Sequence, residues 1–272
     1  MKIVVITGAT SGIGLETAKA FLNEYGCKVK IISISRSMEH IERTRKELPQ
    51  VDYYSCDLSN YETVKKTAQQ IKEKYGRVDV LVNNAGMIVS GGVESLDPEQ
   101  WDKLLKNNLS AYFYTTQSFL PLLKESDYSS IVNISSVSAK RGGTSLAYGV
   151  AKAGVDRFTQ SIAEELAPHG IRVNTVTPGI VGTGIHVHCG VLDDEQYRKF
   201  LEDSAKVYPL GLVKEAEVAA MIVYLSSKKA CSITGADIFI DGGRLAYTAD
   251  KRRKKMEEYN KEKSIKPGIT VL

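Results

Sequence analysis

A tyrosine and a lysine four residues apart form the first pair in this sequence whose types and spacing could do chemistry. Tyr148 and Lys152 lie among small neighbours in the stretch "AYGVAKAGV", residues 147–155. On a helix, side chains at positions i and i+4 project from one face, about 5–6 Å apart at Cβ. A free tyrosine has a pKa of about 10, and a nearby ammonium stabilises the phenolate. We therefore expect Lys152 to lower the pKa of Tyr148 and to suit it to acid or base catalysis.

A serine upstream could complete this group. Ser136 comes twelve residues before Tyr148, at the end of a predicted strand over residues 130–135. A serine hydroxyl there can donate a hydrogen bond to a substrate carbonyl oxygen and share the negative charge that develops on it. Taken alone, the tyrosine and lysine would more often be an ordinary contact on a solvated helix face. The serine and the glycine loop described next favour the catalytic interpretation.

Three glycines follow the first predicted strand in "TGATSGIG", residues 7–14, and lead into a helix that begins near Ile13. Gly8 would allow a tight turn, Gly12 would let a ligand approach the backbone, and Gly14 would permit close contact of helix and strand. The free N–H groups at the start of such a helix favour a pyrophosphate. A glycine-rich turn without a ligand is the alternative, and the position between strand and helix argues against it.

Short β-branched runs alternate with longer amphipathic segments along the whole chain. The predicted strands cover residues 2–6, 28–34, 51–55, 78–82, 130–135, 171–177 and 237–241. The predicted helices cover residues 13–25, 39–47, 60–75, 98–124, 148–167 and 215–227, with Asp97 as the cap of the fourth and Pro98 at its first position. Several strands are nearly continuous apolar runs, which is typical of strands covered on both faces. The pattern predicts one doubly wound parallel α/β sheet of about seven strands with helices on both faces.

The charge of the chain is concentrated at one end. We find no internal repeat and no linker before residue 244, so residues 1–243 are expected to form one domain and residues 244–272 a basic extension. Residues 251–266 carry eight Lys or Arg and three Glu, a local charge of +5, so the net charge of +4 leaves −1 for the rest. A balanced body argues against nucleic-acid binding. The extension is expected to be solvated, and a role across an oligomer interface is the less favoured alternative.

Other classes of protein are disfavoured by what the sequence contains. The four cysteines, Cys27, Cys56, Cys189 and Cys231, are scattered without CxxC spacing, which argues against a disulfide framework or a metal site. The apolar run at 3–6 is too short for a signal-peptide core, and no stretch approaches the roughly 18 apolar residues of a membrane span. We therefore expect a cytoplasmic protein with no membrane or nucleic-acid partner.

Eight motifs in order resemble those of the short-chain dehydrogenase/reductase family, from residue 2 to about residue 243. They are "TGATSGIG" (7–14), "CDLS" (56–59), "NNAG" (83–86), "NNL" (107–109), "NISS" (133–136), "YGVAK" (148–152), "PGIVGT" (178–183) and "TGADIFIDGG" (234–243). Each lies at the carboxyl end of a predicted strand or in the adjoining helix. The resemblance implies an NAD(P)-binding oxidoreductase with a Rossmann fold.

The resemblance assigns catalytic roles to four residues, Asn108, Ser136, Tyr148 and Lys152. "NNL" matches the family pattern on Asn108 rather than Asn107, and the family uses this residue to support a water-linked proton relay. Lys152 would also hold the nicotinamide ribose. A hydride would pass between the nicotinamide and a carbonyl carbon while Tyr148 supplies or removes the proton. The small residues around this pair would leave space for the nicotinamide ring and a neighbouring helix; they are Gly149, Val150, Ala151, Ala153 and Gly154.

The resemblance also implies a set of residues that bind the nucleotide. They are Gly8, Ser11, Gly12, Ile13, Gly14, Ser35, Arg36, Asp57, Leu58, Asn84, Ala85, Gly86, Tyr148, Lys152, Pro178, Gly179, Ile180 and Thr183. Asp57 would bind the adenine ring. Relatives that prefer NAD carry an acid where this chain has Ser35, and the guanidinium of Arg36 can pair with a 2′-phosphate. We therefore predict a preference for NADP(H), with NAD(H) as the alternative because Ser11 stands where many NADP-preferring relatives carry a basic residue.

The substrate is less well defined by the sequence. Residues 184–212 match the family's variable substrate-covering segment, in which we expect an apolar pocket lined by Ile185, Val187, Val191, Leu192 and Tyr208. Such a pocket suits a steroid, a quinone, a sugar-derived ketone or an acyl chain. His186 and His188 alternate as on an extended strand, and a metal pair is the less favoured interpretation because no third ligand is evident.

Three functions remain open in order of preference. The first is an oxidoreductase for a small secondary alcohol or ketone, such as a hydroxysteroid. The second is a 3-oxoacyl-[acyl-carrier-protein] reductase, whose basic docking residues look depleted here at 124–130 and at His169. The third is a regulator that binds nucleotide without catalysis. The resemblance further implies a homotetramer, or a homodimer, built partly from the helices that hold Asn108 and Tyr148.

Overall fold

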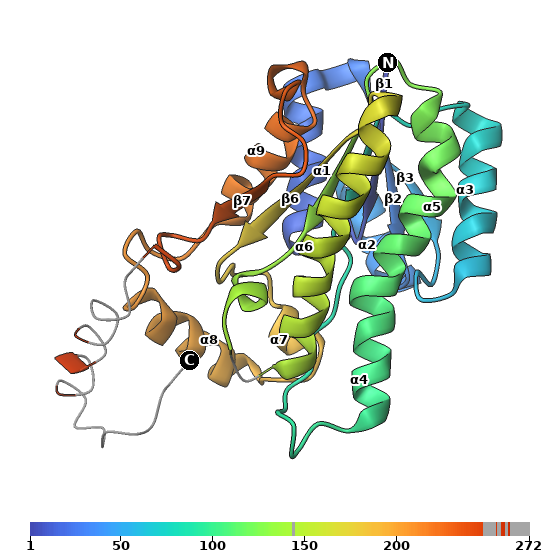
Figure 1. Ribbon diagram of the computed structural model, residues 1–272. Coiled ribbons are helices and arrows are strands. Elements are labelled where there is room, and N and C mark those ends of the chain that lie inside the picture. The colour runs from blue at the N-terminus through green and yellow to red at the C-terminus, as the bar shows by residue number, and fades with distance from the viewer. Residues whose placement is uncertain (143–144, 247–253, 255–256, 259–260, 262–272) are drawn as a thin grey trace.

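The computed structural model describes residues 1–142, 145–246, 254, 257, 258 and 261. In this part of the chain seven parallel strands form one sheet in the order β3-β2-β1-β4-β5-β6-β7, with helices on both faces (Figure 1). The predicted doubly wound Rossmann fold is therefore confirmed. The predicted basic segment at 251–266 lies almost entirely outside the described residues. None of the helices in the described ranges is long and apolar enough to cross a membrane.

Each predicted strand is present with its ends within two residues of the prediction. The strands are β1 (Lys2–Thr7), β2 (Val29–Ser35), β3 (Asp52–Ser55), β4 (Val80–Asn83), β5 (Ser130–Ile134), β6 (Arg172–Pro178) and β7 (Asp237–Ile240). The α-helices are α1 (Gly12–Tyr25), α2 (Met38–Glu47), α3 (Tyr61–Tyr75), α4 (Pro98–Leu105), α5 (Ala111–Lys124), α6 (Leu146–Leu166), α7 (Ile185–His188), α8 (Asp194–Ala205) and α9 (Glu215–Leu225). Short 3₁₀ turns lie at Gly26–Lys28, Val137–Lys140 (η3), Ala167–His169 and Lys228–Ala230.

The helix predicted over 98–124 starts as expected but is not uniform. The carboxylate of Asp97 accepts a hydrogen bond from the backbone N–H of Glu99 at 2.7 Å, and Pro98 opens the helix. A π turn, η2 (Lys106–Ser110), then separates α4 from α5. Turns of this kind inside helices often mark functional sites, and this one contains Asn108.

The segment predicted to be extended at His186 and His188 is helical instead. Gly184 has a φ of +71°, and the short helix α7 begins at the next residue. A second helix, α8, follows, and Asp193 caps it by accepting a hydrogen bond from the backbone N–H of Gln196 at 2.7 Å. The polar–apolar alternation in "IHVH" is too short to distinguish a strand from one helical turn.

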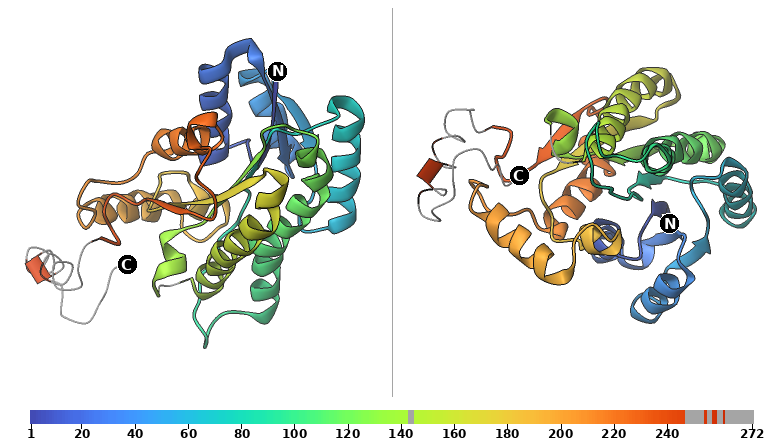
Figure 2. Two further views of the ribbon diagram at one scale, coloured as in Figure 1. Left: turned by 45° about the horizontal axis from the view of Figure 1, so that its top comes forward. Right: turned by 90° about the horizontal axis from the view of Figure 1, so that it is seen from below.

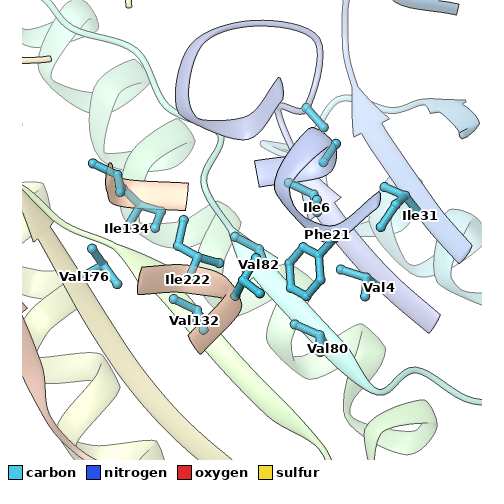
Figure 3. Packing of buried hydrophobic residues seen from close by; sticks show 14 of the residues in the cluster. Val4, Ile6, Phe21, Ile31, Val80, Val82, Val132, Ile134, Val176 and Ile222 are labelled. Atoms are coloured by element: carbon cyan, nitrogen blue, oxygen red, sulfur yellow. The ribbon is translucent and has the colours of Figure 1, made fainter. Parts of the chain in front are cut away.

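Apolar side chains bury the sheet on both faces. On one face Val4 of β1 packs in a cluster with Phe21 of α1 and Ile222 of α9 (Figure 3). On the other face Val5 packs in a second cluster that includes Phe119 of α5. Because successive strand residues point to opposite faces, one continuous apolar run serves both clusters.

All seven strands are parallel, so their carboxyl ends meet at one edge of the sheet. The chain order reverses between β1 and β4, which are neighbours in the sheet. Ligands of open α/β sheets bind at such a reversal, outside the carboxyl ends of the strands. The orange segment that holds α7 and α8 lies beyond this edge, away from the N-terminus (Figures 1 and 2). The functional loops are therefore expected there.

Candidate active site

A cavity of about 520 Å³ lies at this edge, among the loops that follow β1 to β7. Its lining includes every residue that the family resemblance assigned to catalysis or nucleotide binding, except Gly14 and Asn108. The structure thus brings together residues from position 8 to position 183, which the sequence had placed only motif by motif.

The glycine loop has no room for side chains at two of its positions. A Cβ on Gly14 would lie 2.3 Å from the carbonyl oxygen of Gly8, and one on Gly12 would lie 2.9 Å from the Cβ of Thr183. The close contact of helix and strand predicted at Gly14 is therefore present. In the described chain the Ser11 side chain forms no capping hydrogen bond to α1, whose first turn also lacks acidic residues. The N–H groups at this helix end thus fit a pyrophosphate.

The "NNAG" loop after β4 holds the glycine loop in place. The Asn84 amide donates to the carbonyl oxygens of Thr7 at 2.9 Å and of Gly8 at 3.3 Å. In return, the Thr7 hydroxyl accepts the backbone N–H groups of Asn84 at 2.9 Å and Ala85 at 3.0 Å. Behind this loop the buried Asn83 amide donates to Asn133 Oδ1 at 2.8 Å and so joins β4 to β5. The loops after β1 and β4, the two strands between which the chain order reverses, are therefore fixed to each other.

The far end of the cavity has the groups predicted to contact adenine and its ribose. Asp57 accepts hydrogen bonds from the backbone N–H of Ser59 at 3.0 Å and from its hydroxyl at 2.8 Å, which orients the carboxylate. Ser35 is buried at the end of β2, and the exposed Arg36 lines the cavity next to it. The Ser37 hydroxyl caps α2 by accepting the backbone N–H of His40 at 3.3 Å. The guanidinium of Arg36 and the start of α2 therefore lie together.

Tyr148 and Ser136 meet at the opposite end. Tyr148 comes from the first turn of α6, and Ser136 follows β5 directly. The Ser136 hydroxyl accepts the backbone N–H of Ser138 at 3.1 Å, and the Ser136 side chain acts to lower the pKa of the Tyr148 phenol. A Cβ on Gly149 would lie 3.0 Å from the Ser138 carbonyl oxygen. The small residue beside Tyr148 thus admits the backbone of η3, which carries the serine to the phenol.

Burial controls the acidity of the pair more than their mutual attraction does. It raises the pKa of Tyr148 to about 12, although the hydrogen bond from Ser136 opposes the rise. Burial also lowers the pKa of Lys152 to about 7, against the opposing charge of Asp156. The expected lowering of the Tyr148 pKa by Lys152 is therefore wrong for this structure. Burial of Lys152 and partial burial of Tyr148 disfavour their charged forms, and a lysine near its pKa carries only part of a positive charge.

Lys152 has two hydrogen-bond partners that the sequence did not indicate. Its Nζ donates to the hydroxyl of Tyr112 at 3.1 Å and to the carbonyl oxygen of Ile134 at 2.7 Å, and it lies 5.7 Å from the ring centroid of Tyr148. Tyr112 is 1% exposed, and its hydroxyl donates to Ile134 O at 3.2 Å. A buried tyrosine needs a hydrogen-bond partner for its hydroxyl. That rule is the only feature of the sequence that could have connected Tyr112 to the site.

Asn108 is close to the site but does not line the cavity. Its Oδ1 accepts the backbone N–H of Met87 at 2.9 Å, and its Nδ2 donates to Met87 O at 2.7 Å. The amide thus holds the loop after β4 against the π turn. Asn107, which the resemblance passed over, does line the cavity. A Cβ on Gly154 would lie 2.8 Å from Leu109 Cδ2, so the predicted close neighbour of α6 is this π turn.

The substrate-covering segment lines the cavity only in part. Ile185 and Tyr208 do so, whereas the predicted lining residues Val187, Val191 and Leu192 do not. In an extended strand every second residue points to the same face. Because this segment is helical instead, every second residue no longer does so. Residues that the sequence did not single out for the site also line this end, namely Arg141, Phe200 and Arg244, together with Cys189.

The two histidines of α7 lie among rings. The ring centroid of His186 is 4.9 Å from that of Phe200 and 5.8 Å from that of Tyr197, and burial lowers its pKa. His188 lies 6.1 Å from His40 between ring centroids. The histidines are thus part of the packing between α7, α8 and α2.

Comparison with known proteins agrees with this geometry. The family model described as enoyl-(acyl carrier protein) reductase matches residues 8–244. An uncharacterized oxidoreductase of Bacillus subtilis is 36% identical over 253 residues, which cover 91% of this chain and 92% of that protein. A 3-oxoacyl-[acyl-carrier-protein] reductase of Thermotoga maritima is 36% identical over 246 residues, covering 89% and 97% of the two chains.

Solved structures give the same result. A variant of actinorhodin polyketide ketoreductase with NADPH has a TM-score of 0.81 and 32% identity, over 90% of this chain and 98% of the other. The ligand-free aldohexose dehydrogenase of Thermoplasma acidophilum has a TM-score of 0.79 and 31% identity, over 91% and 95%. This chain belongs to the short-chain dehydrogenase/reductase family and is an NAD(P)-binding oxidoreductase that acts on alcohol or ketone groups.

Proposed function

We propose that this protein is an NADP(H)-dependent oxidoreductase that interconverts a secondary alcohol and a ketone with Tyr148 as the acid or base. One observation carries the proposal. Tyr148 and Ser136 line the same cavity as the glycine loop. A group that moves a proton and a site that fits a dinucleotide therefore share one space.

The protein's own groups would act on the substrate oxygen. At neutral pH a phenol with a pKa of about 12 is protonated, so Tyr148 can donate its proton to the oxygen of a ketone. The Ser136 hydroxyl, which is fixed by Ser138, can hold the same oxygen and share its charge. The nicotinamide supplies or accepts the hydride when it is bound.

Lys152 would support the phenolate that the proton transfer leaves behind. Its Nζ is 5.7 Å from the centre of the Tyr148 ring and is held by Tyr112 and Ile134. A cation at this distance in a partly buried site stabilises a developing negative charge. By family resemblance the same amine holds the ribose of the nucleotide.

Removing one hydroxyl tests the assignment of Tyr148. In Tyr148→Phe we expect kcat for ketone reduction to fall by about 10²–10⁴-fold, the usual contribution of a positioned acid or base. Nucleotide binding, measured by fluorescence of the reduced cofactor, should be retained because the ring remains. Tyr224→Phe is the matched control, since Tyr224 is exposed on α9 outside the cavity. Turnover by Tyr148→Phe close to that of the control would refute the assignment.

The preference for NADP(H) is supported by Arg36, which lines the cavity beside Ser35 and the start of α2. A guanidinium pairs with a 2′-phosphate, and a serine in place of an acid removes the repulsion that would exclude it. We expect kcat/KM to be higher with NADPH than with NADH and the order to invert in Arg36→Asp. Arg43→Asp, on the exposed face of α2 outside the cavity, controls for the charge change. Equal preferences in all three proteins would contradict the prediction.

A 3-oxoacyl-[acyl-carrier-protein] reductase is the second candidate function. It is favoured by the relatedness to the Thermotoga maritima enzyme of that name along almost its whole length. The predicted apolar substrate, such as a hydroxysteroid, is supported by Ile185 and Phe200 on the cavity wall. Comparing kcat/KM for acetoacetyl thioesters with that for free ketones discriminates the two, and a preference for thioesters places the reductase first.

We also propose a homotetramer or homodimer built on α5 and α6. Phe113, Leu146 and Val150 expose 45%, 37% and 43% of their surfaces on these helices. Apolar side chains gathered on a helix face are typical of an interface between copies. Light scattering coupled to size-exclusion chromatography tests this, and a mass of about 30 kDa would contradict it.

A further inference from the structure

Two arginines line the cavity, and the reaction described above uses neither. Arg141 follows η3, five residues after Ser136, and Arg244 follows the two glycines that come after β7. Both side chains line the same cavity as Tyr148. They come from segments about one hundred residues apart in the chain, so their meeting is a product of the fold.

Arg244 is a buried cation for which the described residues provide no acidic partner. It is 9% exposed, and its guanidinium carbon lies 4.9 Å from the ring centroid of Tyr208. The nearby carboxylate of Asp241 instead accepts the backbone N–H groups of Gly243 at 3.0 Å and Leu245 at 2.7 Å. Within residues 1–142 and 145–246, no carboxylate forms an ion pair with Arg244. Arg244 lines the cavity, so an anion bound there can reach its guanidinium.

Tyr208 connects this guanidinium to the loop that lines the nucleotide site. Its hydroxyl accepts the backbone N–H of Ile180 at 3.0 Å, and a Cβ on Gly179 would lie 2.9 Å from its ring. Burial raises the pKa of Tyr208, and the charges of Arg244 and Arg141 oppose that rise. Both guanidinium groups are thus within electrostatic reach of one hydroxyl at the edge of the site.

A buried guanidinium is costly unless a counter-charge satisfies it. Its planar fork of N–H donors matches the two oxygens of a carboxylate or the oxygens of a phosphate. The phosphates of a dinucleotide have other places in this cavity, at the start of α1 and beside Arg36. The counter-charge for Arg244 is therefore expected from the second ligand, the substrate.

We infer that Arg244 binds an anionic group on the substrate, so that the enzyme prefers an oxo acid or a phosphorylated ketone over a neutral one. The inference rests on the proposed function, because it assigns the substrate class of the same site. It adds an anionic group to the apolar substrate proposed above. Ile185 and Phe200 would then contact the carbon chain between the carbonyl and the anion.

Matched pairs of substrates test the inference. Pyruvate, acetoacetate, levulinate and 5-oxohexanoate, which differ in the spacing of carbonyl and carboxylate, are each compared with their methyl esters. Dihydroxyacetone phosphate is compared with dihydroxyacetone to distinguish a phosphate from a carboxylate. We expect at least one anion to exceed its neutral partner by tenfold or more in kcat/KM for reduction by the reduced nucleotide.

Variants then assign that preference to the arginine. Arg244→Met should lower kcat/KM for the preferred anion by about 100-fold or more, as expected when one partner of a buried charged contact is removed. Its kcat/KM for the neutral partner should stay within about threefold of wild type. Arg244→Lys, which keeps the charge but loses the fork, should fall between the two. Arg43→Met, an exposed position outside the cavity, should leave the selection for the anion unchanged.

The outcomes separate the two proposals. If neutral ketones are reduced as well as or better than every anion, or if Arg244→Met lowers both members of a pair equally while still binding nucleotide, the inference is wrong and the proposed function stands. If neither anions nor neutral ketones are turned over, the proposed function fails and the inference fails with it.

Discussion

At the scale of residues, the position of the catalytic pair follows from its spacing, but its acidity does not. Tyr148 and Lys152 share one helix face because they are four residues apart, and a sequence is enough to say so. Their pKa values depend on how much water the fold leaves around them. Burial raises the pKa of Tyr148 to about 12 and lowers the pKa of Lys152 to about 7. Neither direction is encoded in the local pattern.

The low pKa of Lys152 predicts a pH dependence. The ammonium is present below a pH of about 7 and is lost as the pH rises through that value, whereas the Tyr148 phenol stays protonated up to about 12. If the ammonium supports proton donation, kcat/KM for ketone reduction should be constant below pH 7 and decline above it. The measurement uses a substrate without ionisable groups between about pH 5 and 9, with buffers of constant ionic strength. A profile that is flat across this range would show that Lys152 does not titrate in the free enzyme.

At the scale of elements, apolar periodicity located the seven strands, because strands buried on both faces leave continuous β-branched runs. The π turn inside the helix predicted at 98–124 was missed, since one inserted turn leaves the helical pattern of apolar residues almost unchanged. Helix α7 was mistaken for an extended segment because four residues carry too little periodicity. Both errors fall beside the cavity, where the backbone departs from regular structure.

The glycines predict different tolerances to the same substitution. Gly14→Ala places a methyl 2.3 Å from the backbone oxygen of Gly8, whereas Gly154→Ala places one 2.8 Å from the flexible side chain of Leu109. Backbone in a tight turn cannot move aside, but a leucine end can change rotamer. We expect Gly14→Ala to lower stability by about 1–3 kcal/mol and to weaken nucleotide binding, with a smaller effect for Gly154→Ala.

Thermal denaturation and nucleotide titration measure both effects. Gly92→Ala is the control, since a Cβ there meets no described atom within 4 Å. Equal losses of stability and nucleotide binding in the Gly14 and Gly154 variants would mean that the glycine loop deforms more easily than its contacts indicate.

A second prediction concerns the strand at the edge of the sheet. The carboxylate of Asp52 in β3 forms salt bridges with Lys30 of β2 at 2.5 Å and with Lys74 of α3 at 2.5 Å. The Tyr75 hydroxyl also donates a hydrogen bond to it. Burial raises the pKa of this carboxyl, but these hydrogen bonds outweigh it and lower the pKa to about 2. Because the folded value is below the unfolded one, the stabilisation is complete above a pH of about 4 and is lost as the pH falls toward 2.

Asp52→Asn should therefore destabilise the protein at neutral pH and remove part of its acid sensitivity. The group is partly exposed, so the effect is expected to be at most about 1 kcal/mol. Denaturant unfolding at pH 7 and pH 3 measures it, with Asp102→Asn on the exposed face of α4 as the control. If Asp52→Asn lowers the free energy of unfolding equally at both pH values, the stabilisation does not depend on ionisation of Asp52 and the prediction is wrong.

At the scale of the whole molecule, the nucleotide half of the site was predictable and the substrate half was not. Its motifs sit directly after strands, so locating the strands located Gly12, Asn84 and Thr183 as well. Arg244 carries no motif, and its place in the cavity depends on how β7 ends and on the contact with Tyr208. A single arginine after a glycine pair gives no periodic signal. The substrate class inferred from it therefore needed the assembled fold.

The cavity draws its walls from both ends of the described domain, from Gly8 after the first strand to Arg244 after the last. During synthesis on the ribosome the phosphate loop emerges early, while the arginine emerges only after almost the entire domain has been translated. A nascent chain consequently cannot complete the wall of this cavity until Arg244 has been translated and β7 has joined the sheet.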